Sequence, residues 1–200
     1  MTKQDFVFIA ENLALELVNT QRMRDGTPVD MLEDYAALVN WLTQAGVLDA
    51  AQAKAALKQW GNSAEGRRVH ERARVLRDAL RSMAEHIVAH KPVPQSSLDV
   101  INEVLRHGAA YAQVVRKRGT FEKHSHADRA EAMQLIVPIA EVASDLLCNG
   151  DLALVKKCNN PHCILFFYDT TKNHARRWCS MAVCGNRMKA AAHYHRRTQQ

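Results

Sequence analysis

Four cysteines near the end of the 200-residue chain are spaced as two pairs that could bind one metal ion. Four residues separate Cys158 from Cys163, four separate Cys179 from Cys184, and the fifteen residues between the pairs are enough for one short β-hairpin. Four thiolates around zinc form a saturated tetrahedron, which leaves no position for water or substrate. The spacing therefore predicts one structural Zn2+ bound by these four cysteines.

The residues around each pair favour the same arrangement. Asn159-Asn160-Pro161 tolerates a tight turn, which would bring the first two sulfurs to one side of the chain. Residues 187–197 are rich in alanine and cations and predict a helix just after Cys184, where the helix dipole would stabilise a thiolate. The expected order is knuckle, β-hairpin, knuckle and helix, as in a treble-clef-like zinc finger.

Disulfides or a thiol redox pair would also use paired cysteines. The N-terminus lacks a cleavable apolar segment, so we expect a cytoplasmic, reducing environment, where cysteines at this spacing more often bind metal. Iron would also be accepted by four thiolates. Cys148 is out of register with the two pairs, and we expect it to lie in the apolar core.

The second cysteine pair also carries a family resemblance. Arg177-Trp178-Cys179-Ser180-Met181, followed by Cys184-Gly185-Asn186-Arg187 and Lys189, resembles the signature of the CGNR zinc-finger family of bacterial proteins. In that family the finger follows a helical domain named ABATE, which is proposed to be a stress-induced transcription regulator. The segment Leu13-Ala14-Leu15-Glu16-Leu17-Val18-Asn19-Thr20 is similar to the opening motif of this domain, although Glu16 stands where the family more often has aspartate.

Positive charge is concentrated in the expected finger. The whole chain has a net charge of +6, and residues 151–200 contain nine Lys or Arg against two Asp or Glu. Such a module suits a phosphate-bearing partner, although cations also offset the negative charge of a zinc tetrathiolate. The residues that we expect to contact duplex DNA are Arg176, Arg177, Arg187, Lys189, Arg196 and Arg197.

Residues 1–150 predict an all-α body with a small β-hairpin, and residues 151–200 form the finger. Apolar residues at helical spacing, together with capping residues, predict helices at 12–19, 30–46, 49–60, 65–90, 96–107 and 128–147, the last kinked at Pro138. Between them, residues 22–29 predict a loop and residues 109–126 a hairpin. On the helix at 65–90, a stripe from Val69 to Ile87 faces the core, and we expect the arginines opposite to be solvated.

These features favour a DNA-binding transcription regulator whose helical domain senses a small molecule. A protein-interaction scaffold and a thiol-based redox sensor are the alternatives that the same residues allow. We expect no enzyme activity, because the chain lacks Walker and Rossmann glycine patterns and the HExxH motif. No apolar run has the length of a membrane span, and the oligomeric state is not predicted.

Overall fold

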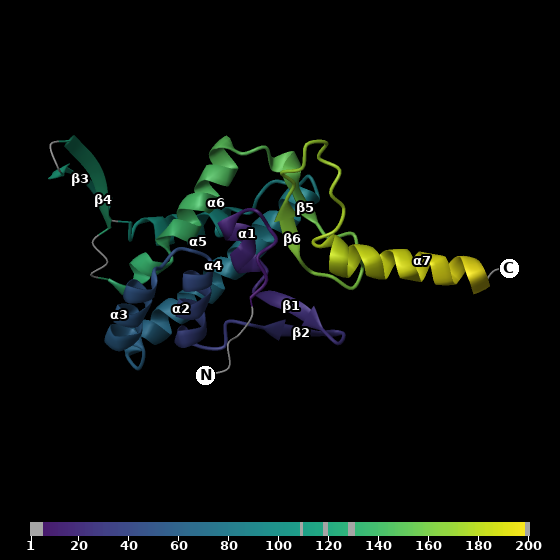
Figure 1. The fold of residues 1–200 in the computed structure, drawn as a ribbon, viewed down its shortest axis with the longest axis horizontal. Coiled ribbons are helices and arrows are strands. Elements are labelled where there is room, and N and C mark those ends of the chain that lie inside the picture. Colours follow the sequence, from purple (N-terminus) through teal and green to yellow (C-terminus); the bar gives the residue numbers. More distant parts are fainter. Residues whose placement is uncertain (1–5, 109, 118–119, 128–130, 199–200) are drawn as a thin grey trace.

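A computed structural model describes residues 6–108, 110–117, 120–127 and 131–198 of the chain. In this part the protein is mostly helical, with three small antiparallel hairpins, as the sequence predicts for the fold class (Figure 1). No helix among these residues is long and apolar enough to cross a membrane. The helices are α1 Leu13–Val18, α2 Tyr35–Gln44, α3 Ala50–Trp60, α4 Ala64–Val88, α5 Gln95–Leu105, α6 Val137–Asn149 and α7 Asn186–Thr198.

Helix α4 is the longest element and lies at the centre of the body. It begins where the Ser63 hydroxyl accepts a hydrogen bond from the Gly66 amide, and its last turn is followed by His90 in a left-handed conformation. The predicted stripe from Val69 to Ile87 is buried against the other helices. The 3.6-residue period therefore identified the face of α4 that forms the core.

Two helices begin later than the sequence predicts. Helix α2 is capped by Asp34, whose carboxylate accepts from the Ala37 amide, so Asp30 is not its cap. Helix α6 begins at Val137 and has Pro138 in its first turn, where a missing N–H does not disturb the helix. The predicted kink at Pro138 is therefore wrong, and residues 128–130 of the predicted helix lie outside the described part of the chain.

The predicted loop at residues 22–29 is a hairpin. Strands β1 Gln21–Arg24 and β2 Thr27–Asp30 pair antiparallel around a turn in which Asp25 and Gly26 both have positive φ. The predicted hairpin at 109–126 is confirmed by β3 Ala110–Lys117 and β4 Thr120–Ala127. In Figure 1 this second hairpin projects from the side of the body opposite to α7.

One arginine on the polar side of α4 is fully buried, so the prediction that all of them are solvated is wrong. Arg77 donates to both carboxylate oxygens of Asp30, over 2.6 and 2.7 Å, and to the hydroxyl of Thr20 over 3.0 Å. Burial would raise the pKa of Asp30, but the hydrogen bonds from Arg77 and the Leu32 amide hold it below its usual value. The pair fixes the end of β2 to α4.

Replacing Asp30 with alanine would leave the Arg77 guanidinium buried without its main partner. We expect the free energy of unfolding to fall by about 3–5 kcal/mol, measured by urea denaturation at neutral pH. Asp78→Ala is the matched control, because Asp78 lies 3.9 Å from the Arg77 Nε atom and is 68% exposed. That variant should lose less than about 1 kcal/mol. Equal losses in the two variants would contradict the role given to Asp30.

Candidate metal centre and nucleic-acid surface

The first cysteine pair lies at the end of a short hairpin. Strands β5 Val155–Lys157 and β6 Phe166–Tyr168 pair antiparallel, and the turn between them holds Cys158 and Cys163. The Cys158 amide donates to the Leu165 carbonyl, and the Cys163 amide donates to the Asn160 carbonyl. The finger hairpin therefore encloses the first pair, whereas the sequence placed it between the two pairs.

The second pair lies where the chain enters α7. Cys179 is buried just before a π-helical turn over Met181–Gly185 that contains Cys184 and continues into α7. A side chain at Gly185 would come within 2.4 Å of the Met181 sulfur and 3.1 Å of the Trp178 ring. A side chain here would have to displace the flexible Met181 and approach the Trp178 ring, so the glycine of the CGNR signature relieves crowding at this turn.

The four sulfurs form one cluster. They all lie within 4.8 Å of one another, with 3.7 Å between Cys163 and Cys179 and 3.5 Å between Cys179 and Cys184. Zinc–sulfur bonds of about 2.3 Å in a tetrahedron place sulfurs about 3.8 Å apart, so the cluster fits the ion. The side-chain amide of the buried Asn160 donates to the Cys184 sulfur over 3.3 Å and orients this ligand.

Crowding changes the proton affinity of these thiols. Hydrogen bonds from Cys163 and Cys179 lower the pKa of Cys158, while the pKa values of Cys163 and Cys179 are raised because each donates to a neighbouring sulfur. Such a cluster holds protons that a metal ion must displace. Its chemistry is therefore that of a structural metal site whose affinity increases with pH.

The side-chain amide of Asn19 attaches the finger to the body, because it forms the two backbone hydrogen bonds that a neighbouring strand would form. The Asn19 side chain donates to the Phe166 carbonyl over 2.8 Å and accepts from the Phe166 amide over 2.9 Å. Two residues further along the same strand, the Tyr168 amide donates to the Ala10 carbonyl over 2.8 Å. Phe166 and Phe167 are fully buried and belong to the same apolar core as α1 and α4.

One arginine and one carboxyl complete this attachment. Arg81 donates to the Val18 carbonyl at the end of α1 and to the Ile164 carbonyl beside Cys163. Glu16, only 7% exposed, accepts from the Ala10 amide, and burial raises its pKa. The finger therefore packs on the body, with the opening motif of the chain lying between them.

Asp169 fixes the loop that joins the two cysteine pairs. It is fully buried and accepts from the Lys156 ammonium, from the amide and hydroxyl of Thr171, and from the Arg176 amide. Burial alone would raise the pKa of Asp169, but these hydrogen bonds hold it well below its usual range. The carboxylate stays charged and orders the loop.

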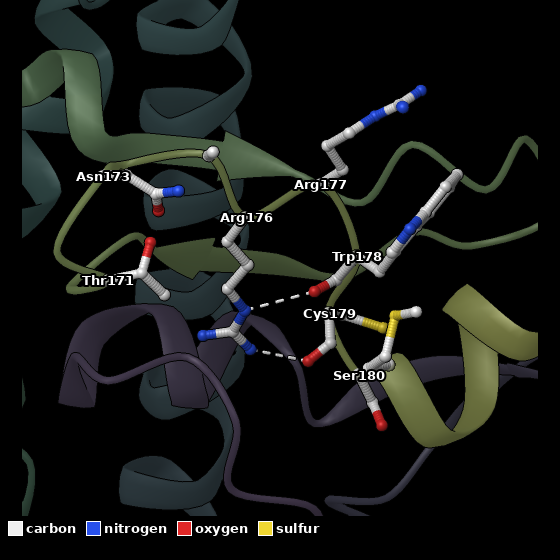
Figure 2. Close-up of a pocket in the computed structure, with 9 residues that line it drawn as sticks. Thr171, Asn173, Arg176, Arg177, Trp178, Cys179 and Ser180 are labelled. Atoms are coloured by element: carbon white, nitrogen blue, oxygen red, sulfur yellow. Dashed lines mark hydrogen bonds between the residues drawn. The ribbon is translucent and has the colours of Figure 1, made fainter.

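Arg176, a residue expected to contact DNA, is committed within the protein. Its guanidinium donates to the carbonyls of Trp178, Cys179 and Ile9, and it stacks 4.3 Å from the centre of the Phe167 ring. Figure 2 shows it pointing toward the first two carbonyls, whereas Arg177 points away. The geometry gives Arg176 a structural role in place of the expected one.

The other expected contacts lie outside the core. Arg177 is exposed beside the Trp178 ring, at the edge of an open hollow of about 490 Å³ that contains no carboxylate. Arg187, Lys189 and Arg197 are exposed on α7, and the side chain of Arg196 lies outside the described residues.

Two sequence-based expectations about packing near the site are wrong. Ala191 and Ala192 are exposed, so they do not form the packing side of α7 that the sequence predicts together with Met188, which is half-buried, and in Figure 1 the helix projects away from the body. Cys148 is exposed on α6 and does not lie in the core. It also takes no part in the four-sulfur cluster.

The fold and the site define a class: a helical protein that ends in a tetracysteine zinc finger. Residues 11–150 match the ABATE family, described as "Putative stress-induced transcription regulator", and residues 155–197 match the CGNR zinc finger. The chain belongs to the ABATE family and carries a CGNR zinc finger, which confirms the resemblance seen in the sequence. The finger match and the sulfur cluster together support one structural zinc ion. No curated protein matches the chain.

Sequence reasoning missed four residues that hold the finger in place: Glu16, Asn19, Arg81 and Asp169. One signal was present, because Glu16 and Asn19 are polar residues within a mostly apolar opening motif. A polar residue retained in a buried helix needs a partner, and here the partners lie in the backbone of the finger and of the segment before α1.

We expect one zinc ion per chain, bound by Cys158, Cys163, Cys179 and Cys184. Elemental analysis of Cys179→Ala should show most of the zinc lost, because three thiolates bind the ion less tightly and leave it open to water. Cys148→Ala is the matched control and should keep a full equivalent. Undiminished zinc in Cys179→Ala would overturn the ligand assignment.

We expect Asn19→Ala to weaken both the fold and the metal site. The change removes two hydrogen bonds from a buried strand, at roughly 1–3 kcal/mol for each backbone group left unpaired. Zinc affinity, measured by competition with a chelator, should fall as well, because binding and folding of the finger are linked. Asn40→Ala, which removes an exposed hydrogen bond donated by the Gln44 side chain, should change neither quantity. Identical behaviour of the two variants would contradict the proposed attachment.

Proposed function

We propose that this chain is a non-enzymatic transcription regulator that binds duplex DNA through α7 and the adjoining Arg177. The observation that supports this most directly is the position of α7, which projects from the body with its cations exposed (Figure 1). A cytoplasmic location belongs to the same proposal. The sensing of a small molecule by the helical domain stays a prediction.

The dimensions of α7 suit the major groove. Its thirteen residues span about 20 Å at 1.5 Å per residue. The major groove of B-DNA, about 12 Å wide, admits one α-helix, and an exposed helix can enter it without repacking the protein. The zinc site would fix the angle of this helix, because Cys184 lies in the turn that leads into it.

The charge of the segment also supports a phosphate-bearing partner. After Asp169 the sequence contains no acidic residue, while it contains seven lysines and arginines. The cations on α7 therefore have no carboxylate on their own helix to neutralise them. Arg197 lies between three and four helical turns beyond Cys184, so it is too distant to serve mainly as a counter-charge for the thiolates.

A protein partner is the second candidate, and two exposed apolar residues favour it. Met181 is 48% exposed and Val183 is 56% exposed, both in the turn before α7. Two such side chains form only a small apolar patch, whereas the cations extend along the whole helix. For this reason we place DNA first.

We expect Lys189→Ala/Arg197→Ala to weaken binding to duplex DNA of any sequence. If each residue contacts one phosphate, the slope of log affinity against log salt should decrease by up to about 1.8, measured by fluorescence anisotropy. The fold and the zinc content should be unchanged, because both side chains are exposed.

Lys54→Ala/Lys58→Ala is the matched control, since it removes the same charge from exposed positions on α3. It should bind DNA nearly as the parent does. If the α7 variant also binds like the parent, α7 is not the contact surface, and the protein-partner function takes precedence.

A further inference from the structure

The hairpin β1–β2 projects from the same side of the body as α7 (Figure 1). Its base is fixed at both ends. β1 begins two residues after Asn19, which bonds to Phe166 of the finger, and β2 ends at Asp30, which is held by Arg77. The Met31 amide also donates to the Thr20 carbonyl and closes the base. The hairpin is therefore held in a fixed relation to both the finger and α4.

The strand register separates the residues of this hairpin onto two faces. Gln21 pairs with Asp30, and Arg22 pairs with Val29. Side chains alternate between faces along a strand, and the Asp30 carboxylate faces α4 because it binds the buried Arg77. Arg22 and Arg24 therefore lie on the opposite face, which points away from α4.

This outer face presents two positive charges for which the described part of the chain provides no ion-pair partner. Arg24 is exposed and Arg22 is half-buried, and neither forms an ion pair with any residue that the structure describes. Asp30 is neutralised by Arg77, so Asp25 at the turn is the remaining acidic residue of the hairpin. Two neighbouring cations with one opposing charge at the tip form a surface suited to an external anion.

We propose that the β1–β2 hairpin is a second DNA contact, in which Arg22 and Arg24 bind backbone phosphates beside the groove occupied by α7. This inference rests on the function proposed above. Contacts to phosphate fix the register of a protein on the duplex but do not read the bases. In this arrangement α7 faces the bases, and the hairpin limits how the helix can rotate or slide.

The test compares zinc-loaded full-length parent and Arg22→Ala/Arg24→Ala on a fluorescein-labelled duplex of mixed sequence, about 30 base pairs or three helical turns long. Loss of two phosphate contacts should lower the salt slope by about 1.8, so that raising salt fourfold weakens the variant about 12-fold less than the parent. At low salt the variant should bind roughly 10-fold more weakly than the parent. Lys54→Ala/Lys58→Ala again controls for net charge.

A second variant identifies the kind of contact. Arg22→Lys/Arg24→Lys keeps both charges but loses the planar guanidinium, so it should retain most of the affinity if the partners are phosphates. Circular dichroism, zinc content and unfolding temperature establish that each variant is folded. A lysine variant as weak as the alanine variant would overturn the phosphate contact.

The outcomes separate this inference from the function on which it rests. If the parent binds DNA, Lys189→Ala/Arg197→Ala weakens it, and Arg22→Ala/Arg24→Ala does not, the hairpin is not a contact and the role of α7 stands. If the zinc-loaded parent does not bind duplex DNA even at low salt, both proposals are overturned, and an acidic protein becomes the candidate partner of the basic surfaces.

Discussion

The pairing of Asn19 with Phe166 is the interaction on which the arrangement of this molecule depends. Strand β6 would otherwise end the finger hairpin with a buried and unpaired backbone edge, which folded proteins rarely tolerate. The Asn19 side chain, at the end of α1, forms hydrogen bonds with both the N–H and the carbonyl of Phe166. Because β6 leads directly from Cys163, the same contact sets where the first two sulfurs lie relative to the body.

The basic residues of the chain fall into two groups with different physical roles. Arg77, Arg81 and Arg176 are at least partly buried, and each donates to carboxylates or backbone carbonyls of another segment. Arg177, Lys189 and Arg197 are exposed. Guanidinium suits the first role because its planar set of donors can bridge several acceptors at once. Net charge alone therefore overstates the number of cations available to a partner.

The sequence predicts those features that depend on local spacing. The cysteine pairs follow from their four-residue gaps, the core face of α4 from a stripe of apolar residues, and the hairpin of β3 and β4 from a loss of helical period. The family resemblance, carried by the CGNR signature, predicted the order of a helical domain followed by a zinc finger.

Features that depend on distant partners could not be predicted in the same way. The position of Arg77 on the polar side of α4 predicts that it is solvated. Its partner Asp30 lies 47 residues away in the sequence, so local spacing could not indicate the ion pair. Strands β5 and β6 have only three residues each, too few to show a period, so their hairpin was placed after the first cysteine pair instead of around it. Gly26 and Pro28 suggested a loop, although a glycine at positive φ and a proline in a short, two-stranded hairpin are both compatible with strands.

The exposure of α7 has a consequence for how such proteins diversify. The side chains at residues 189–192 and at Arg197 are exposed, so the steric requirements that act on Gly185 and the cysteines do not apply to them. We expect substitutions at these exposed positions to leave the stability of the protein and its affinity for the metal unchanged. These positions of the terminal helix are therefore ones at which recognition specificity can change with little effect on the fold.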